Sequence, residues 1–275
     1  MKTRTTIMLI VISMFGAVSA QAARTTPVSK DEAAGWVRHT VPLPKQIEIT
    51  GKVVLPADRI TVRLTGSSDA LANQAAQELR ETIGATQNAR ENGSQFTILL
   101  QLEGQGSAKL KSLANADQAY RIIPDVSNNT LRLVALAPHG LYYAAKTLQQ
   151  LLKANHADGK VAIPIVKVTD WPDMATRGLW GVDAFLHVQW LSDRKYNHME
   201  QIAHSVIDEN KRSVCLLAGQ KRRMVDDGPI YGINPVPAIV HLEHMGGKGV
   251  YEAYPALKGQ GEGVHSGAAC YSNHK

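Results

Sequence analysis

Cysteine is scarce in this 275-residue sequence, which limits how the chain can be stabilised. Only Cys215 and Cys270 are present. A single possible pair cannot form the disulfide framework of a small secreted domain, so stability has to come from a buried core. One bridge between them stays open if the chain reaches an oxidising compartment, but two separate thiols are the default interpretation. The sequence also lacks the Gly-x-Ser-x-Gly and Cys–His arrangements of nucleophilic enzymes.

Aromatic residues and clustered positive charge are also few. Aromatics make up 5% of the chain, and the basic residues behind its formal net charge of +6 are scattered. The one short basic run, Lys221-Arg222-Arg223, has no aromatics interleaved with it, which is typical of a solvated turn. Nucleic acid is therefore not expected as a partner. The hydrophobic fraction of 44% predicts a globular core.

Only the N-terminus carries a long apolar run. Lys2 and Arg4 precede the run Ile7–Val18, and Ala20-Gln21-Ala22 fits a small-x-small cleavage site. A helix that spans a bilayer needs roughly 20 apolar residues, and this run is shorter. We therefore predict a cleaved signal peptide over residues 1–22 and export to the periplasm or beyond, with no membrane attachment afterwards. A retained anchor is the less favoured alternative.

The part of the chain after a polar leader over residues 23–41 shows alternating strand and helix patterns. The first helix is predicted from a cap at Ser68 or Asp69 to Gly84, because apolar residues recur there at helical spacing. The other predicted elements are strands over 47–55, 60–64, 96–102, 119–123, 130–135 and 161–168, and a helix over 138–153. This order favours the α+β class, with a mixed or antiparallel sheet and two helices on one face.

A turn at residues 170–173 marks the predicted domain boundary. We assign residues 42–172 to the α+β domain and residues 173–275 to a second segment, in which glycine and proline are dense. A short helix is predicted near residues 190–196, and residues 198–207 fit a strand or a helix. The most convincing late strand covers residues 236–242.

Several motifs occur in an order that resembles a known family. They are PLPKQIEITGKVVL, ANQAAQELRETIG, AYRII, HGLYYAAKTLQQLL, IPIVKVTDWPDM and RGLWGVD, between residues 42 and 182. Together they resemble the N-terminal domain of bacterial β-N-acetylhexosaminidases. The resemblance implies a non-catalytic α+β layer, followed by a catalytic (β/α)₈ barrel whose first strand opens at the Arg-Gly dipeptide. It also implies that N-acetylhexosamine-containing glycans are the substrates and that no cofactor or metal is needed.

The resemblance implies substrate-binding roles for Arg177 and Asp183. The family's arginine binds sugar hydroxyls, a task that suits its fixed and always charged donors. Asp183 stands one residue later than the acid of the family's first strand. From the residues alone, Arg177 fits equally well as a strand-end contact in an interdomain interface. The implied reaction is substrate-assisted hydrolysis, in which the acetamido oxygen of the sugar attacks the anomeric carbon. One acid of an adjacent pair orients the acetamido group, and the other protonates the leaving oxygen.

The family's catalytic acid pair is not found after Arg177. Residues 178–275 also fall well short of the roughly 250 residues of a complete barrel. We therefore expect a partial barrel segment, a shortened or fragmentary copy, and no catalytic residue is assigned. The alternative function is a non-catalytic module that binds carbohydrate or protein through its exposed sheet face.

Four other groups of residues fit structural roles better than functional ones. Asp226-Asp227 precedes Gly228-Pro229 and is typical of a turn more than of a catalytic pair. The set His241, Glu243, His244 and His265 lacks zinc-site spacing, so solvent exposure or a sugar cleft is favoured. The glycine-rich run 259–263 lacks the lysine of a phosphate loop. The tryptophans at 171, 180 and 190 fit packing better than sugar stacking.

Overall fold

The computed structural model describes nine stretches of the chain. They are residues 23–66, 69–84, 95–153, 156–180, 188–202, 204–210, 213–216, 225–238 and 250–258. The predicted signal peptide lies outside them. None of the helices in these stretches has the length and apolarity needed to cross a membrane.

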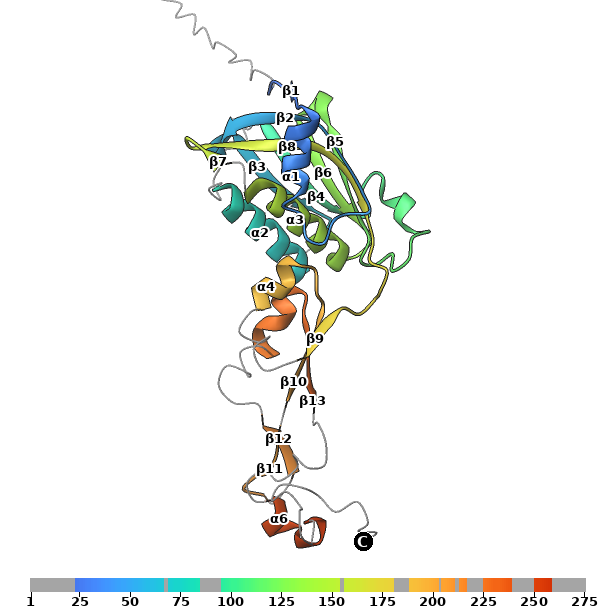
Figure 1. Cartoon of the computed structure of the whole chain (residues 1–275), viewed down its shortest axis with the longest axis vertical. Coiled ribbons are helices and arrows are strands. Elements are labelled where there is room, and N and C mark those ends of the chain that lie inside the picture. Colours follow the sequence, from blue (N-terminus) through green and yellow to red (C-terminus); the bar gives the residue numbers. More distant parts are fainter. Residues whose placement is uncertain are drawn as a thin grey trace, which may run out of the picture.

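An eight-stranded mixed sheet forms the larger part of the molecule (Figure 1). Its strands run in the order β1-β2-β8-β5-β6-β4-β3, and β7 pairs with β8. β3, β4 and β6 are parallel, whereas β5 and β8 pair antiparallel with their neighbours. The strands are β1 (Thr26–Pro27), β2 (Gln46–Pro56), β3 (Ile60–Thr65), β4 (Phe96–Leu102), β5 (Tyr120–Asp125), β6 (Thr130–Ala135), β7 (His156–Ala157) and β8 (Lys160–Asp170). The α+β class and the mixed sheet are therefore confirmed.

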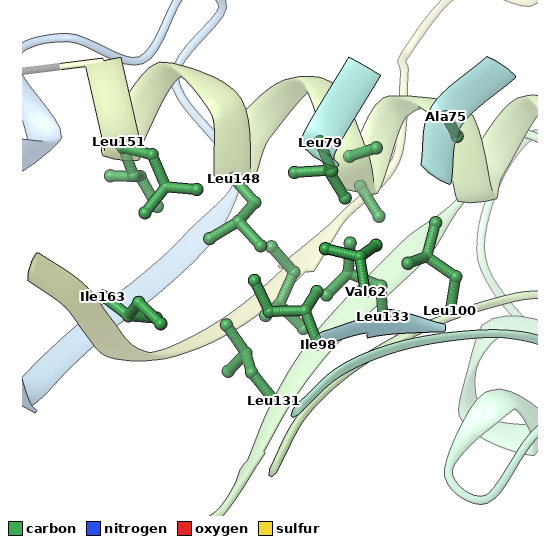
Figure 2. Packing of buried hydrophobic residues seen from close by; sticks show 14 of the residues in the cluster. Val62, Ala75, Leu79, Ile98, Leu100, Leu131, Leu133, Leu148, Leu151 and Ile163 are labelled. Carbon is green, nitrogen blue, oxygen red and sulfur yellow. The ribbon is translucent and has the colours of Figure 1, made fainter. Parts of the chain in front are cut away.

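Two helices, α2 (Ala70–Ile83) and α3 (Pro138–Lys153), pack on this sheet. The predicted start and end of α2 are both confirmed. The Asp69 side chain accepts hydrogen bonds from the backbone of Leu71 and Ala72, and Gly84 ends the helix at a φ of +73°. Figure 2 shows Leu79 of α2 and Leu148 of α3 above sheet residues such as Ile98 and Leu131. This interleaved apolar layer is the core of the molecule.

A further helix, α1 (Lys30–Val37), lies within the stretch that the sequence reading treated as a polar leader. Ser29 caps it, and Trp36 is buried in the same core as α2 and α3. Glu32 also pairs with Lys52 of β2 at 2.6 Å. The leader interpretation was wrong because one buried tryptophan, without an apolar stripe, gives too weak a periodic signal to predict a helix.

A small three-stranded parallel sheet follows the main sheet, in the order β13-β10-β9. Its core contains Leu191, Met199 and Ile233. The described residues close no barrel. The elements are β9 (Gly178–Trp180), α4 (Val188–Asp193), β10 (His198–Ile202), β11 (His204–Ile207), β12 (Ser213–Leu216), β13 (Asn234–Ala238) and α6 (Val250–Ala253), together with the 3-10 helices η6 (Gly228–Tyr231) and η8 (Pro255–Leu257). β11 and β12 form a hairpin, which lies with α6 beyond the small sheet (Figure 1).

Candidate functional site at the junction of the two sheets

Arg177 lies directly before β9, between the two sheets. Its Nε and Nη2 donate to the backbone carbonyl of Lys195 at 3.0 and 2.8 Å. Its Nη1 donates to Gln118 Oε1 at 2.8 Å and to the carbonyl of Met174 at 2.7 Å. The guanidinium also lies 5.3 Å from the centre of the Tyr143 ring, within cation–π range. These contacts fix the plane of the guanidinium from both sides of the junction.

Lys195 contributes a buried ammonium group to the same junction. Its Nζ lies 2.7 Å from Tyr120 Oη and 3.2 Å from Asp170 Oδ2. Tyr120 donates its hydroxyl proton to Asp170 at 2.8 Å and lies 2.6 Å from Thr147 Oγ1. Burial lowers the pKa of Lys195, and the neighbouring Asp170 carboxylate opposes that shift. A buried cation is tolerated here because a carboxylate and a hydroxyl both face it.

The residues around this network line a pocket of about 250 Å³. Trp171 and Met174 provide apolar wall, and Lys45 and Asp173 form an ion pair of 2.6 Å at its edge. Burial raises the pKa of Tyr143, which also lines the pocket, to about 12, so this phenol keeps its proton at neutral pH. The pocket is therefore amphipathic, with fixed donors beside aromatic and aliphatic surface.

A second set of contacts connects α3 to α4. Lys146, whose side chain is 4% exposed, bridges Glu78 Oε2 at 2.6 Å and Asp193 Oδ1 at 2.9 Å. Next to it, the hydroxyls of Tyr142 and Ser192 are 2.8 Å apart, and Tyr142 donates to Glu78 at 2.9 Å. The start of the small sheet is thus attached to the main domain through two buried polar clusters.

The profile of the family described as "Glycosyl hydrolase family 20, domain 2" matches residues 38–171. This range covers the main sheet from β2 onward, together with α2 and α3. Residues 38–171 are a domain 2 of glycosyl hydrolase family 20. The resemblance predicted from the sequence motifs is confirmed, and the range is called domain 2 below.

Solved structures of glycosidases share the fold of this chain. The chitobiase of Flavobacterium johnsoniae matches with a TM-score of 0.57 at 16% identity, over 80% of this chain and 37% of the enzyme. The exo-β-N-acetylglucosaminidase of Vibrio harveyi, solved with N-acetylglucosamine, matches with a TM-score of 0.56 at 14% identity, over 82% and 39%. The β-N-acetylhexosaminidase of Bacteroides fragilis matches with a TM-score of 0.56 at 15% identity, over 84% and 50%.

These matches concern the fold, and this chain spans between about a third and a half of the length of those enzymes. They extend past domain 2, because each covers 80% or more of the chain, whereas domain 2 alone ends at residue 171. A comparison with curated protein sequences finds no match.

Of the two predicted substrate-binding residues, the structure describes one. Arg177 lies at the boundary between domain 2 and β9, in the contacts given above, and Asp183 lies outside the described residues. Asp170 begins the turn at residues 170–173 that the sequence predicts, whereas the sequence indicates no role for Lys195 or Tyr120 at the junction. No local pattern identifies those two, because they lie 75 residues apart and meet only through the fold.

The other predicted constellations are only partly described. Asp226 and Asp227 are exposed and lie in a short helical segment over residues 225–227 that leads into η6, where a tight turn was predicted. The histidine set at 241–265, the glycine run 259–263 and Cys270 lie outside the described residues. Among the residues that are described, no group of three or more side chains has the arrangement of a metal site.

The three tryptophans near the junction have different surroundings. Trp171 is half-buried and lines the pocket. Trp180 is 60% exposed on β9, and Trp190 is 45% exposed, with the Arg194 guanidinium 3.9 Å from its ring centre.

Two polar residues of the small sheet, His198 and Glu200 of β10, have side chains 3.2 Å apart. The sequence gave no signal for this pair.

Proposed function

We propose that this chain acts in an exported glycoside hydrolase that cleaves N-acetylhexosamine-containing glycans. In this proposal domain 2 is a non-catalytic support, and β9, β10 and β13 are the first strands of the catalytic (β/α) barrel. The observation that supports it most strongly is the parallel sheet directly after domain 2, attached through Arg177 and Lys195. Parallel strands at this position are what the start of such a barrel requires.

The proposed chemistry is substrate-assisted hydrolysis, in which the acetamido oxygen of the sugar acts as the nucleophile. Arg177 and Asp183 are the proposed contacts to the sugar. Arg177 suits this role because its guanidinium is already held in one plane by Lys195 and Gln118. A donor that is fixed before binding loses little conformational entropy when a sugar hydroxyl arrives.

A pair of chromogenic substrates tests the proposal. The full product of the gene should release 4-nitrophenol from 4-nitrophenyl N-acetyl-β-glucosaminide and not from the matched β-glucoside, which lacks the acetamido group. Arg177→Ala should raise KM for the first substrate. Hydrolysis of both substrates at similar rates would contradict the substrate-assisted step, and hydrolysis of neither would contradict the proposed reaction.

Export is a separate part of the proposal, with a separate test. The mass of the mature protein recovered from the periplasm or medium should correspond to a chain that starts at Ala23. A chain that keeps its first 22 residues and remains with the cells would contradict it.

One observation favours a second candidate function, a module that binds a ligand through the sheet surface. A hollow of about 500 Å³ lies over β5 and the turn that follows, lined by Arg121, Asp125 and Arg132. Binding of a glycan by the 275-residue chain, lost in Arg121→Ala and unaffected by Arg177→Ala, would favour this function over catalysis.

A further inference from the structure

We propose that Lys195 is the positioning residue through which domain 2 sets the orientation of Arg177. This proposal relies on the proposed function for one point, that Arg177 binds a sugar. The geometry of the connection itself comes from the described contacts. Lys195 takes part twice, once through its side chain and once through its backbone.

The side chain of Lys195 fastens the residue to domain 2. Its side chain is 5% exposed, and its ammonium contacts Asp170 at the end of β8 and Tyr120 at the start of β5. β5 and β8 are adjacent strands of the main sheet, and Tyr120 and Asp170 are directly paired in register. Two neighbouring, rigid strands therefore hold the ammonium between them.

The backbone carbonyl of Lys195 binds the side chain of Arg177. Lys195 has a φ of +60°, in the left-handed region that a side-chain-bearing residue seldom occupies. In this conformation its carbonyl accepts both the Nε and the Nη2 hydrogen bonds of Arg177. A left-handed lysine costs energy unless the surrounding contacts compensate for it, and the buried ammonium supplies such contacts.

Arg177 is also fixed through a neighbour of Lys195. The Asn197 side chain accepts from the Arg177 backbone N–H at 2.8 Å and donates to Gln118 Oε1 at 3.3 Å. Gln118 Oε1 is also the acceptor of Arg177 Nη1. Removing the Lys195 ammonium should therefore loosen the Nε and Nη2 side of the guanidinium and leave the Nη1 side in place.

This asymmetry gives a test that does not need enzymatic activity. In the 275-residue chain, nuclear magnetic resonance can follow the exchange of the Arg177 Nε proton with water, and the signal is identified by its loss in Arg177→Lys. Lys195→Met should speed this exchange by at least about tenfold, because a hydrogen bond to a charged group is lost or weakened. Lys52→Met is the matched control, since it removes the half-buried pair with Glu32 within the N-terminal part of the molecule.

A second variant keeps the proposal testable if Lys195→Met does not fold. Asp170→Asn keeps the size of the side chain and removes the charge that faces the ammonium. It should speed Arg177 Nε exchange in the same direction as Lys195→Met, and the double variant should add little to either single change. Unchanged exchange in a folded Lys195→Met chain overturns the proposal; if that variant does not fold, unchanged exchange in Asp170→Asn does so.

The effect on substrate is measured separately, on the full product of the gene. Lys195→Met should raise KM for the chromogenic N-acetylglucosaminide several-fold more than it changes kcat, as expected when a binding contact shared by ground and transition states is weakened. A fall in kcat alone, with KM unchanged, overturns the positioning role. If the protein hydrolyses no N-acetylhexosaminide, the proposed function fails, while the exchange experiment still decides whether Lys195 positions Arg177.

Discussion

Domain 2 and the small sheet after it are stabilised by different interactions. Among the described residues, the core of the main sheet and its helices contains 32 buried residues. The core of the small sheet contains Leu191, Met199 and Ile233, and the nearby Trp180 and Trp190 stay largely exposed. Apolar burial stabilises the first region. The second depends on polar contacts with the first, through Lys146 and Lys195.

This difference predicts how far the destabilising effect of a substitution should extend in each region. A change in the core of domain 2 should weaken everything that rests on it. A change in the small sheet should leave domain 2 folded, because the main core, as far as the structure describes it, contains no buried apolar side chain from the small sheet. The predictions below test this asymmetry, beginning with the largest expected effect.

The largest effect is expected from Leu148→Ala in α3. Leu148 is fully buried above the sheet (Figure 2), so its removal leaves a cavity and should lower the free energy of unfolding by about 2–5 kcal/mol. Met199→Ala, at an equally buried site in the small sheet, should leave the unfolding of domain 2 unchanged. Urea denaturation followed by circular dichroism measures both. Equal losses in the two variants would contradict the asymmetry.

A smaller effect is expected from Lys146→Met, which breaks the contact between α3 and α4. Loss of a buried pair costs about 3–5 kcal/mol, and we expect about 2 here because Asp193 remains partly in water. Limited proteolysis should cut within residues 188–238 sooner than in the unaltered chain, with residues 42–170 still protected. Lys45→Met is the control, because its pair with Asp173 is exposed and worth about 0–1 kcal/mol. Equal proteolysis in the two variants would argue against a buried polar attachment.

Gly140→Ala tests the close contact between α3 and the sheet. A Cβ at this position would lie 2.4 Å from the carbonyl oxygen of Ala119, so the helix has to move, at a cost of about 1–3 kcal/mol. Gly35→Ala in α1 is the control. No atom of the described residues lies within 4 Å of its added Cβ, and alanine should there stabilise the helix by up to about 1 kcal/mol. The two melting temperatures should shift in opposite directions.

The main elements of domain 2 were predictable because their signals are local. α2 combines a capping aspartate, apolar residues at helical spacing and a terminal glycine, and each strand is a short run of β-branched residues. α1 was missed because Trp36 is the only buried residue in it. Its place in the core depends on a strand partner that the local pattern does not identify.

The candidate site was predictable only in part. Arg177 and Asp170 stood in a motif, so the sequence located the junction. The partners that fix them, Tyr120 and Lys195, are 75 residues apart and meet only because β5 and β8 are neighbours in the sheet. The role of Lys195 also depends on its left-handed backbone, a conformation that the residue type argues against.

The smallest expected effect concerns Asp125, the last residue of β5. Hydrogen bonds from Asn128 and Ser127 hold the pKa of its carboxyl below the usual range, and Arg132 pairs with it. A carboxyl with a lowered pKa in the folded state stabilises the fold at neutral pH. This contribution is lost as the pH falls from the ordinary value through the lowered pKa, because over that range the unfolded chain takes up a proton that the folded carboxylate does not. Asp125→Asn should therefore cost less than about 1 kcal/mol at pH 7, and this cost should shrink as the pH falls through the lowered pKa, by urea denaturation at neutral and at acidic pH. A loss that persists undiminished in acid would mean that the shape of the turn, not its charge, stabilises this edge of domain 2.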